Sequence, residues 1–368
     1  VSRMEASLEG KADKLAAIVR EAVSHLLTEL AEHAGERTEA IETVIITGNT
    51  SMLYFLTQKD PRCLSRAPFE ADELFGWWTT GEALDLSCRK ADVYLPRCMS
   101  AFVGADITTA ILGSGLTETD CIPGADGRCK EAAAAIDPNV SCRETDGVSA
   151  THSGKSRMMV DVGTNGEIVL FHKERLICCA TAAGPAFEGA GLSSGMRGVA
   201  GAIDHVSWEN GSWKVHVIGD REASTAEGIC GSGVIDGVAG LLESGLLEGT
   251  GYLEEDVCFA GNVGLTAADI REVQLAKGAI RAGMETLLAE EKMDAAGLEG
   301  LYVAGGFGSY MSAKSAERIG LFPKIDLSRI KICGNAALAG AVKILHNRRM
   351  EKEATALAER AKTINLGT

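Results

Sequence analysis

Apolar residues recur at helical spacing near the start of the chain. Across residues 11–34 they fall on one stripe, which predicts an amphipathic helix. The stripe comprises Leu15, Ile18, Val19, Ala22, Leu26 and Leu30. Residues 60–90 lack this period, so we expect loops there. Apolar runs predict a strand at 43–46 followed by a helix from Met52. Further runs predict a second strand at 91–95 and a short helix at 107–112.

The second half of the chain begins with strands separated by tight turns and ends with helices. We expect strands at 158–162, 167–172, 176–182, 203–209, 213–218 and 301–304. The dipeptides Asn165-Gly166 and Asn210-Gly211 are typical of hairpins. Helices are expected near 232–245, 266–290, 335–348 and 351–363, with Thr266 and Asp269 as a capping arrangement for the second. This order of elements indicates an α/β fold.

Residues 114–156 interrupt this pattern. They are rich in Gly, Ser, Thr, Asp and Cys and show no apolar periodicity. We interpret them as a surface insertion or a linker between two lobes. The organisation expected from the sequence is therefore a first lobe at 1–113 plus 334–368, the insertion, and a second lobe at 157–333.

Composition narrows the class of protein. The chain has 368 residues, of which 46% are hydrophobic and 24% charged, so it can bury a sizeable core and is long enough for two lobes. A net charge of -15 argues against a nucleic-acid or anionic-membrane surface, because both favour clustered cations. No apolar run approaches the roughly 20 residues needed to span a bilayer, and no signal peptide opens the chain, so we expect a cytoplasmic protein.

Cysteine and histidine give no metal signature. The 11 cysteines are scattered without a CxxC pair, and the seven histidines lack ligand spacing. We therefore expect buried, reduced thiols and no metal–thiolate site.

Glycine is abundant where strands end, and one such segment runs from Asp161 to Glu167. Its turn, Gly163-Thr164-Asn165-Gly166, follows a buried strand. Exposed N–H groups in a turn of this kind can cradle phosphate oxygens, and an Asp beside it can hold Mg²⁺ through water. A plain type I′ hairpin without a ligand explains the residues equally well.

Three further segments carry candidate chemistry. Val303-Ala304-Gly305-Gly306-Phe307-Gly308 ends a strand with bare backbone, which lets a ring or a phosphate approach, although a simple strand-to-helix turn remains open. The small residues of 334–341 allow either helix sliding or ordinary close packing. Asp106 is either the N-cap of the helix at 107–112 or a carboxylate that orients a water for attack on a phosphate.

Taken together and in this order, these segments resemble the superfamily of acetate and sugar kinases, Hsp70 and actin. A narrower resemblance, to the ATPase part of the reductive activators of corrinoid proteins, rests on four motifs. These are Gly48-Asn49-Thr50-Ser51-Met52, Asp161-Val162-Gly163-Thr164-Asn165-Gly166-Glu167, Ala183-Gly184-Pro185-Ala186-Phe187-Glu188-Gly189-Ala190 and Gly228-Ile229-Cys230-Gly231-Ser232-Gly233.

The resemblance implies a two-lobed actin-like α/β fold with the first lobe truncated at its N-terminus, because the hairpin that carries the first phosphate loop of such proteins has no counterpart here. It also implies site residues. Asp106 and Asp161 would be catalytic, with Asp161 holding Mg²⁺ through water. The nucleotide-binding residues would be Gly163, Thr164, Asn165, Gly166, Gly231, Ser232, Gly305, Gly306, Phe307 and Gly308.

The implied function is ATP binding and hydrolysis that drive an electron from an iron–sulfur cluster onto a Co(II) corrinoid protein. The cofactors would be ATP and Mg²⁺, with the iron–sulfur cluster in a domain absent from this chain, and independent hydrolysis by this chain would be impaired. The implied partner is a corrinoid protein, with no nucleic acid and no membrane, and a homodimer is left open. The alternatives are a small-molecule kinase of the same superfamily and a non-catalytic partner-binding scaffold.

Overall fold

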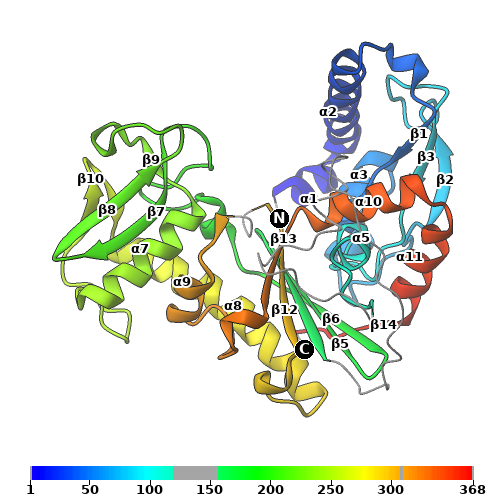
Figure 1. Cartoon of the computed structure of the whole chain (residues 1–368). Coiled ribbons are helices and arrows are strands. Elements are labelled where there is room, and N and C mark those ends of the chain that lie inside the picture. The colour runs from blue at the N-terminus through cyan, green and yellow to red at the C-terminus, as the bar shows by residue number, and fades with distance from the viewer. Residues whose placement is uncertain (1, 119–155, 307–309, 367–368) are drawn as a thin grey trace, which may run out of the picture. The chain divides into compact units, whose positions relative to one another are not determined.

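The computed structural model describes residues 2–118, 156–306 and 310–366. The described chain divides into two compact units (Figure 1). Unit 1 holds residues 2–118 and 336–363, and unit 2 holds residues 156–306, 310–335 and 364–366. The expected insertion at 114–156 falls outside the described residues from 119 to 155.

Unit 1 surrounds a small sheet with helices. Its helices are α1 (Ser2–Ala6), η1 (Ser7–Lys11), α2 (Ala12–His33), η2 (Thr38–Ala40), α3 (Thr50–Thr57), α4 (Arg62–Ser65), α5 (Ala105–Ser114), α10 (Ala336–His346) and α11 (Arg349–Arg360), with β14 (Ala361–Thr363) at its end. The sheet order is β1 (Thr43–Ile45), β3 (Asp92–Leu95), β2 (Trp77–Thr80). β1 runs parallel to β3, and β2 runs antiparallel to it.

The helix predicted at 11–34 is confirmed as α2, but only part of its apolar stripe faces the core. Ile18, Leu26 and Leu30 are 52%, 59% and 66% exposed, whereas Leu27 and Ala31 are buried. Leu27, Val19 and Val23 of α2 pack on the core of unit 1, so Val19 of the predicted stripe faces the core whereas Ile18, Leu26 and Leu30 face away from it.

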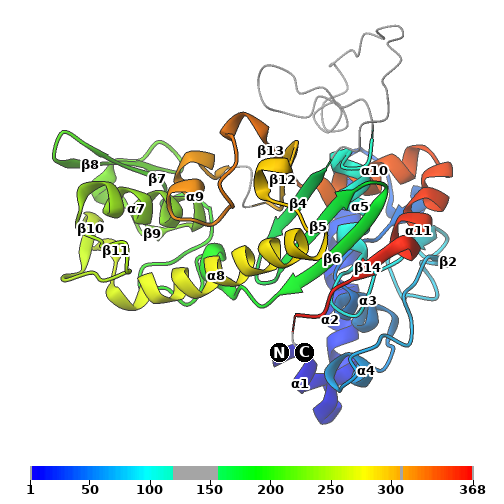
Figure 2. The same cartoon turned by 90° about the horizontal axis from the view of Figure 1, so that it is seen from below.

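Unit 2 contains a larger sheet covered by a long helix. The strands lie in the order β13 (Ile330–Gly334), β12 (Gly300–Ala304), β4 (Arg157–Val162), β5 (Gly166–His172), β6 (Arg175–Thr181). β12 is parallel to both β13 and β4, and β4, β5 and β6 form an antiparallel meander. Helix α8 (Ala267–Glu290) runs across this sheet (Figure 2), and the expected Thr266–Asp269 capping box begins it.

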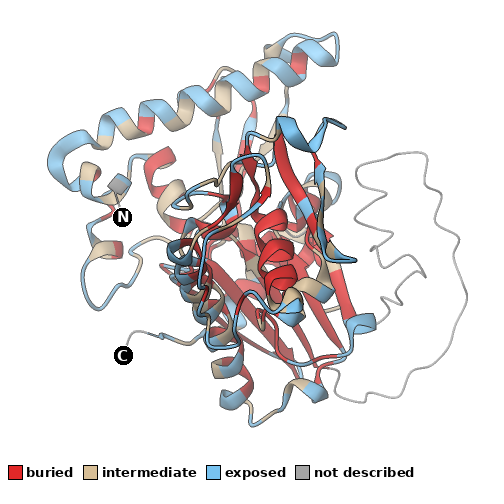
Figure 3. Cartoon of the chain, turned by 90° about the vertical axis from the view of Figure 1, so that its left-hand side faces the viewer, coloured by how far each residue is buried: buried red, intermediate tan, exposed pale blue. Residues whose placement is uncertain are grey.

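A second sheet in unit 2 has the order β8 (Ser212–Val217), β7 (Ala202–Glu209), β9 (Gly228–Ile229), and α7 (Gly231–Ser244) packs on it. The remaining elements are η3 (Pro185–Glu188), η4 (Ala223–Thr225), β10 (Val257–Ala260), β11 (Val263–Leu265), η5 (Ala295–Gly297), α9 (Ala313–Arg318) and η7 (Leu327–Arg329). Burial is concentrated in the strands and in the helix faces that cover them (Figure 3).

Helices α5 and α10 touch through their backbones inside unit 1. A Cβ on Gly340 would lie 1.8 Å from the carbonyl oxygen of Thr109, and a Cβ on Gly113 would lie 2.0 Å from that of Ala336. Real Cβ atoms do not approach that closely, so both glycines are required for the crossing. The small residues of 334–341 therefore serve close helix packing here.

The α/β class predicted from the sequence is confirmed. Six of the described strands were not foreseen: β2, β9, β10, β11, β13 and β14. Of these, β2 lies in the stretch expected to be loops, and β14 replaces the end of the helix expected at 351–363. None of the described helices is both long and apolar enough to cross a membrane.

Candidate functional site

The carboxylate of Asp161 lies where three strands of unit 2 come together. Asp161 is the register partner of Ala304 in β12 and of Glu167 in β5. The chain then continues from β12 into Gly305, whose φ of 94° favours glycine. A Cβ on Gly305 would lie 2.6 Å from Asp161 Oδ1, so the half-buried carboxylate and the bare backbone of Gly305 adjoin each other.

The turn after Asp161 is not a type I′ hairpin, so that interpretation is wrong. Val162 pairs with Gly166, which leaves three residues in the loop. A type I′ turn needs positive φ at both central residues, as Asn210 (51°) and Gly211 (80°) show in the β7–β8 hairpin. Neither residue of Asn165-Gly166 has a positive φ.

Gly166 is a glycine for a different reason, which is packing. A Cβ there would lie 2.7 Å from Thr181 Oγ1 and 2.8 Å from Ile280 Cγ1. The β4–β5 hairpin therefore packs closely against α8 at Gly166.

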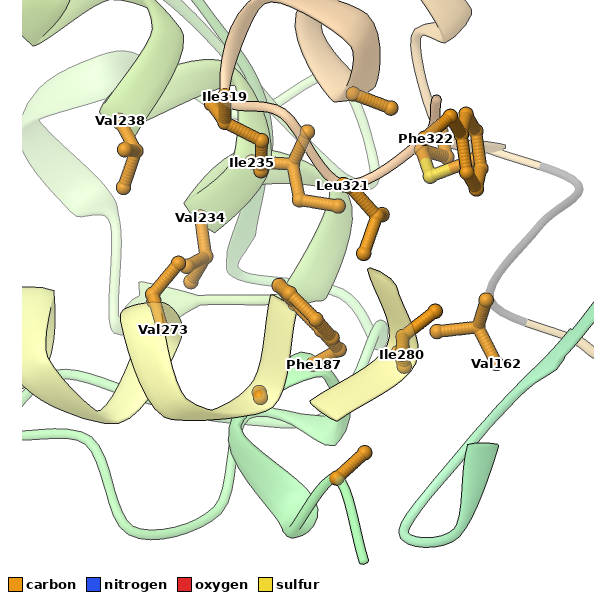
Figure 4. Packing of buried hydrophobic residues seen from close by; sticks show 14 of the residues in the cluster. Val162, Phe187, Val234, Ile235, Val238, Val273, Ile280, Ile319, Leu321 and Phe322 are labelled. Carbon is orange, nitrogen blue, oxygen red and sulfur yellow. The ribbon is translucent and has the colours of Figure 1, made fainter. Parts of the chain in front are cut away.

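Glu188 fixes the tip of this loop from the other side. One of its carboxylate oxygens accepts a hydrogen bond from Thr164 N at 2.8 Å, and the other accepts one from Thr164 Oγ1 at 2.8 Å. The neighbouring Phe187 is 1% exposed and packs among Val234 of α7 and Ile280 of α8 (Figure 4). The core of unit 2 thus positions η3, and η3 positions the loop.

A pocket of about 550 Å³ opens beside Glu188. Its lining comes from several segments of unit 2: Phe187, Glu188, Arg197, Gly198, Asp204, His216, Ile218, Gly219, Asp220, Cys230, Gly231, Ser232, Gly306 and Tyr310. Helix α7 begins at the pocket, and no side chain caps its first turn. Uncapped N–H groups at a helix start favour a negatively charged ligand group.

The charged groups of the pocket are arranged in pairs. Asp204, which is 8% exposed, accepts a hydrogen bond from His216 Nδ1 at 2.5 Å. This bond raises the pKa of His216 above its ordinary value. Asp220 Oδ1 lies 3.6 Å from His216 Nε2, and Arg197 is an exposed cation on the pocket wall.

Asp106 belongs to unit 1 and is not the N-cap of its helix. The N-cap of α5 is Gly104, and Asp106 follows two residues later. Its Oδ1 accepts a hydrogen bond from Ile107 N at 3.0 Å and lies 2.5 Å from where a Cβ on Gly104 would stand. The Gly48 carbonyl accepts the backbone N–H of Ala105 at 3.0 Å, which places the Gly48-Asn49-Thr50 loop beside it. Burial raises the pKa of Asp106 to about 6.

The predicted site residues fall into three groups. Gly231, Ser232 and Gly306 line the pocket, and the turn at 163–166 reaches it through the Thr164–Glu188 bonds. Asp161 and Gly305 lie together at the strand ends, and Asp106 lies in unit 1. Phe307 and Gly308 are outside the described residues.

Sequence reasoning missed several lining residues, among them Arg197, Asp204, His216 and Asp220. Glu188 could have been found, because it stands in one of the four motifs behind the resemblance. Within the described ranges, no three His, Cys, Asp or Glu side chains are grouped so that they could hold a metal ion by themselves.

Comparisons with known proteins place this geometry in a family. Residues 155–368 match the family described as the C-terminal domain of RACo, the ASKHA domain, and residues 1–119 match the RACo middle region. The chain is 30% identical over 377 residues to the corrinoid activation enzyme RamQ of Eubacterium limosum, covering 93% of this chain and 56% of RamQ. It is also 35% identical over 203 residues to a Methanosarcina barkeri protein named as the reductase of the Co(II) methylated amine-specific corrinoid protein, covering 50% of this chain and 37% of that protein.

Among solved structures, a reductive activator for a corrinoid, iron–sulfur protein matches with a TM-score of 0.83 and 30% identity. The match covers 100% of this chain and 57% of that one, so the chain spans little more than half the length of these relatives. The predicted actin-like superfamily fold and the resemblance to corrinoid activators are confirmed. The chain belongs to the RACo family of reductive activators, of which it carries the middle region and the C-terminal ASKHA domain.

Proposed function

We propose that this chain is the ATP-dependent part of a reductive activator of a corrinoid protein. In the proposed reaction one electron leaves an iron–sulfur cluster and reduces Co(II) of the corrinoid to Co(I), and ATP hydrolysis drives this uphill step. Family membership and the printed names of the relatives support the proposal. The described residues themselves offer no ligand set for the cluster.

The observation that carries the nucleotide part is the continuity of the unit 2 pocket with the glycine turn. Glu188 lines the pocket, and its carboxylate also accepts hydrogen bonds from the backbone N–H and the hydroxyl of Thr164. We place the phosphates of ATP at the side formed by Gly306, the start of α7 and the 163–166 turn, where the uncapped N–H groups of the first turn of α7 are available. The nucleoside then extends toward the β7–β8 side of the pocket.

Mg²⁺ fits the carboxylates at the strand ends. Asp161 and Glu167 are directly opposed in the β4–β5 ladder, so their side chains share one face of the sheet. A Mg²⁺ ion beside them would lower the repulsion between these carboxylates and the phosphates. Mg²⁺ would supply the positive charge, and it binds through few protein oxygens because it retains most of its waters. Asp161 would orient those waters.

Asp106 is the proposed catalytic carboxylate of unit 1. A base works best when its pKa is close to the operating pH, and a pKa of about 6 brings Asp106 nearer to neutrality than an ordinary carboxyl. Its carboxylate would accept a proton from the water that attacks the terminal phosphate.

The nucleotide part can be tested by calorimetry with Mg-ADP on this chain. We expect binding, and we expect Glu188→Gln to weaken it by about tenfold, because the amide has only one oxygen acceptor for the two Thr164 donors. Glu209→Gln, at the end of β7, is the matched control and should bind as the parent does. Absence of Mg-ADP binding to the parent chain would contradict the proposal.

A further inference from the structure

Two histidine–aspartate pairs stand side by side on the β7–β8 ladder. His205 and His216 are register partners, and their ring centroids are 6.3 Å apart. Asp236 of α7 accepts from His205 Nδ1 at 3.0 Å, and Asp204 accepts from His216 Nδ1 at 2.5 Å. The two pairs have the same chemistry, but only His216 and Asp204 line the pocket.

A β-bulge produces the pair that faces the pocket. The β7–β8 register runs from Ile203↔Val217 directly to His205↔His216, so Asp204 has no partner of its own in the ladder. The extra residue of a bulge is free to turn its side chain out of the strict alternation. Asp204 is thereby buried beneath His216 while remaining on the pocket wall.

This arrangement fixes what His216 can offer to a ligand. Its Nδ1 is occupied by Asp204, so Nε2 is the atom available. Asp220 Oδ1 lies 3.6 Å from Nε2, which places a hydrogen-bond donor beside a carboxylate acceptor. Both side chains are at the rim, since His216 is 51% and Asp220 is 99% exposed.

We propose that His216, oriented by Asp204 and assisted by Asp220, recognises the ribose hydroxyls of the bound nucleotide. The inference rests on the proposed function, because it assumes that the pocket holds a nucleotide. A vicinal diol matches the pair: one hydroxyl accepts from His216 Nε2–H, and the other donates to the Asp220 carboxylate. Carboxylates commonly bind ribose hydroxyls in nucleotide sites.

The surroundings favour a sugar over the other parts of a nucleotide. Asp204 and Asp220 would repel a phosphate at this rim. A base is more apolar than a sugar and is better placed deeper in the pocket, along Ile218 and Phe187. The water-exposed rim suits the hydroxyls, which remain partly hydrated when bound.

Binding should depend on the charge of His216. The charged and titratable groups that face it are Asp204 and His205 of β7, Asp220 after β8, and Arg197 and Glu188 across the pocket. Asp204 raises the pKa of His216, so the imidazolium persists to a higher pH than an ordinary histidine would allow. Above that pKa the charge-assisted bond from Nε2 is lost, and affinity should fall by about threefold to tenfold.

Calorimetry on the full chain with Mg-ADP and its 2′-deoxy and 3′-deoxy analogues tests this inference. We expect each deoxy analogue to bind about tenfold to a hundredfold more weakly than Mg-ADP, because a charged partner loses its hydrogen bond. His216→Gln should lose the preference for the one hydroxyl that His216 binds, so that Mg-ADP and one of the two deoxy analogues bind with similar affinity, and it should lose the pH dependence. His205→Gln, which alters the pair outside the pocket, should behave as the parent protein does.

The ligand series on the unaltered chain needs no folded variant, so a His216→Gln protein that fails to fold leaves the test intact. Asp204→Asn gives a second check, because it should move the fall in affinity to lower pH while leaving Nε2 in place. Equal affinity for Mg-ADP and both deoxy analogues would overturn the ribose inference alone. A weaker binding of Mg-IDP, which lacks the amino group of adenine, that disappears in His216→Gln would also overturn it by assigning His216 to the base. No binding of Mg-ADP at any pH would contradict the inference and the proposed nucleotide site together.

Discussion

The Asp161 carboxylate is fixed by backbone that approaches it, whereas the Asp106 carboxylate is affected by the loss of water around it. Gly305 lies against Asp161 Oδ1 and leaves no room for a side chain. Asp106 is half-buried, and burial raises its pKa to about 6. A group kept in an unfavourable charge state points to a use for that group other than stability.

Asp106→Asn should separate stability from activity. The folded pKa of about 6 lies above the ordinary value of 3.8, so between these values the folded state binds more protons than the unfolded state. Stability contributed by this group therefore falls as pH rises through that window. We expect Asp106→Asn to melt at a higher temperature than the parent above pH 6, and this advantage should shrink as the pH falls toward 4. ATP hydrolysis in the activator should decrease.

Thermal melting across pH 4 to 8 gives the stability side of this test, and phosphate release gives the activity side. If the variant loses stability by the same amount at every pH, the raised pKa of Asp106 is not what the substitution removes. If turnover is unchanged, the catalytic role of Asp106 is wrong.

At the scale of elements, close helix contacts and turns explain where glycine is needed. The same dipeptide, Asn-Gly, forms a positive-φ turn at 210–211 but a different three-residue loop at 163–165. The dipeptide predicted that both hairpins exist. It could not predict their turn type, because Gly166 is required by Ile280, a residue more than a hundred positions away.

The long or strongly periodic elements were predictable, including α2, α7, α8 and the meander from β4 to β6. β2 and β13 were not, because neither carries a continuous apolar run and each is defined by its pairing with a neighbouring strand, β3 or β12. The pocket shows the same limit. Sequence motifs predict its glycines. Asp204 and His216 line it because of a β-bulge, which no local sequence pattern predicts.

The α5–α10 crossing supplies a prediction about packing. Gly340→Ala should destabilise unit 1 by about 2 kcal/mol or more, because its Cβ would meet the Thr109 carbonyl and the two helices would have to separate. Gly278→Ala in α8 is the matched control, because it faces open space. The control should be neutral or more stable by about 0.5–1 kcal/mol, as expected from helix propensity.

Urea unfolding of both variants checks this pair. Equal stability of Gly340→Ala and the parent chain would show that the two helices can move apart at low cost. The small residues of 334–341 would then be better explained as a sliding helix contact.

At the scale of the whole molecule, each unit holds one of the two proposed catalytic carboxylates, and unit 2 holds the pocket. These parts lie in the two regions that match the RACo family, the middle region and the ASKHA domain. The chain covers 56% of RamQ and 57% of the solved activator, and we propose that its residues supply the nucleotide side of the reaction. The net charge of -15 fits a protein that acts on a protein partner rather than on nucleic acid.

The most direct test of the account is anaerobic absorption spectroscopy of a Co(II) corrinoid protein mixed with this protein, a reduced iron–sulfur donor and Mg-ATP. We expect Co(I) to appear with Mg-ATP and to fall to the level without nucleotide when Mg-ADP replaces it. Asp161→Asn should lower the rate by about tenfold or more while its melting temperature stays within a few degrees of the parent's. Formation of Co(I) at the same rate with and without ATP, or at the parent's rate with Asp161→Asn, would contradict the claim that nucleotide held by unit 2 drives the reduction.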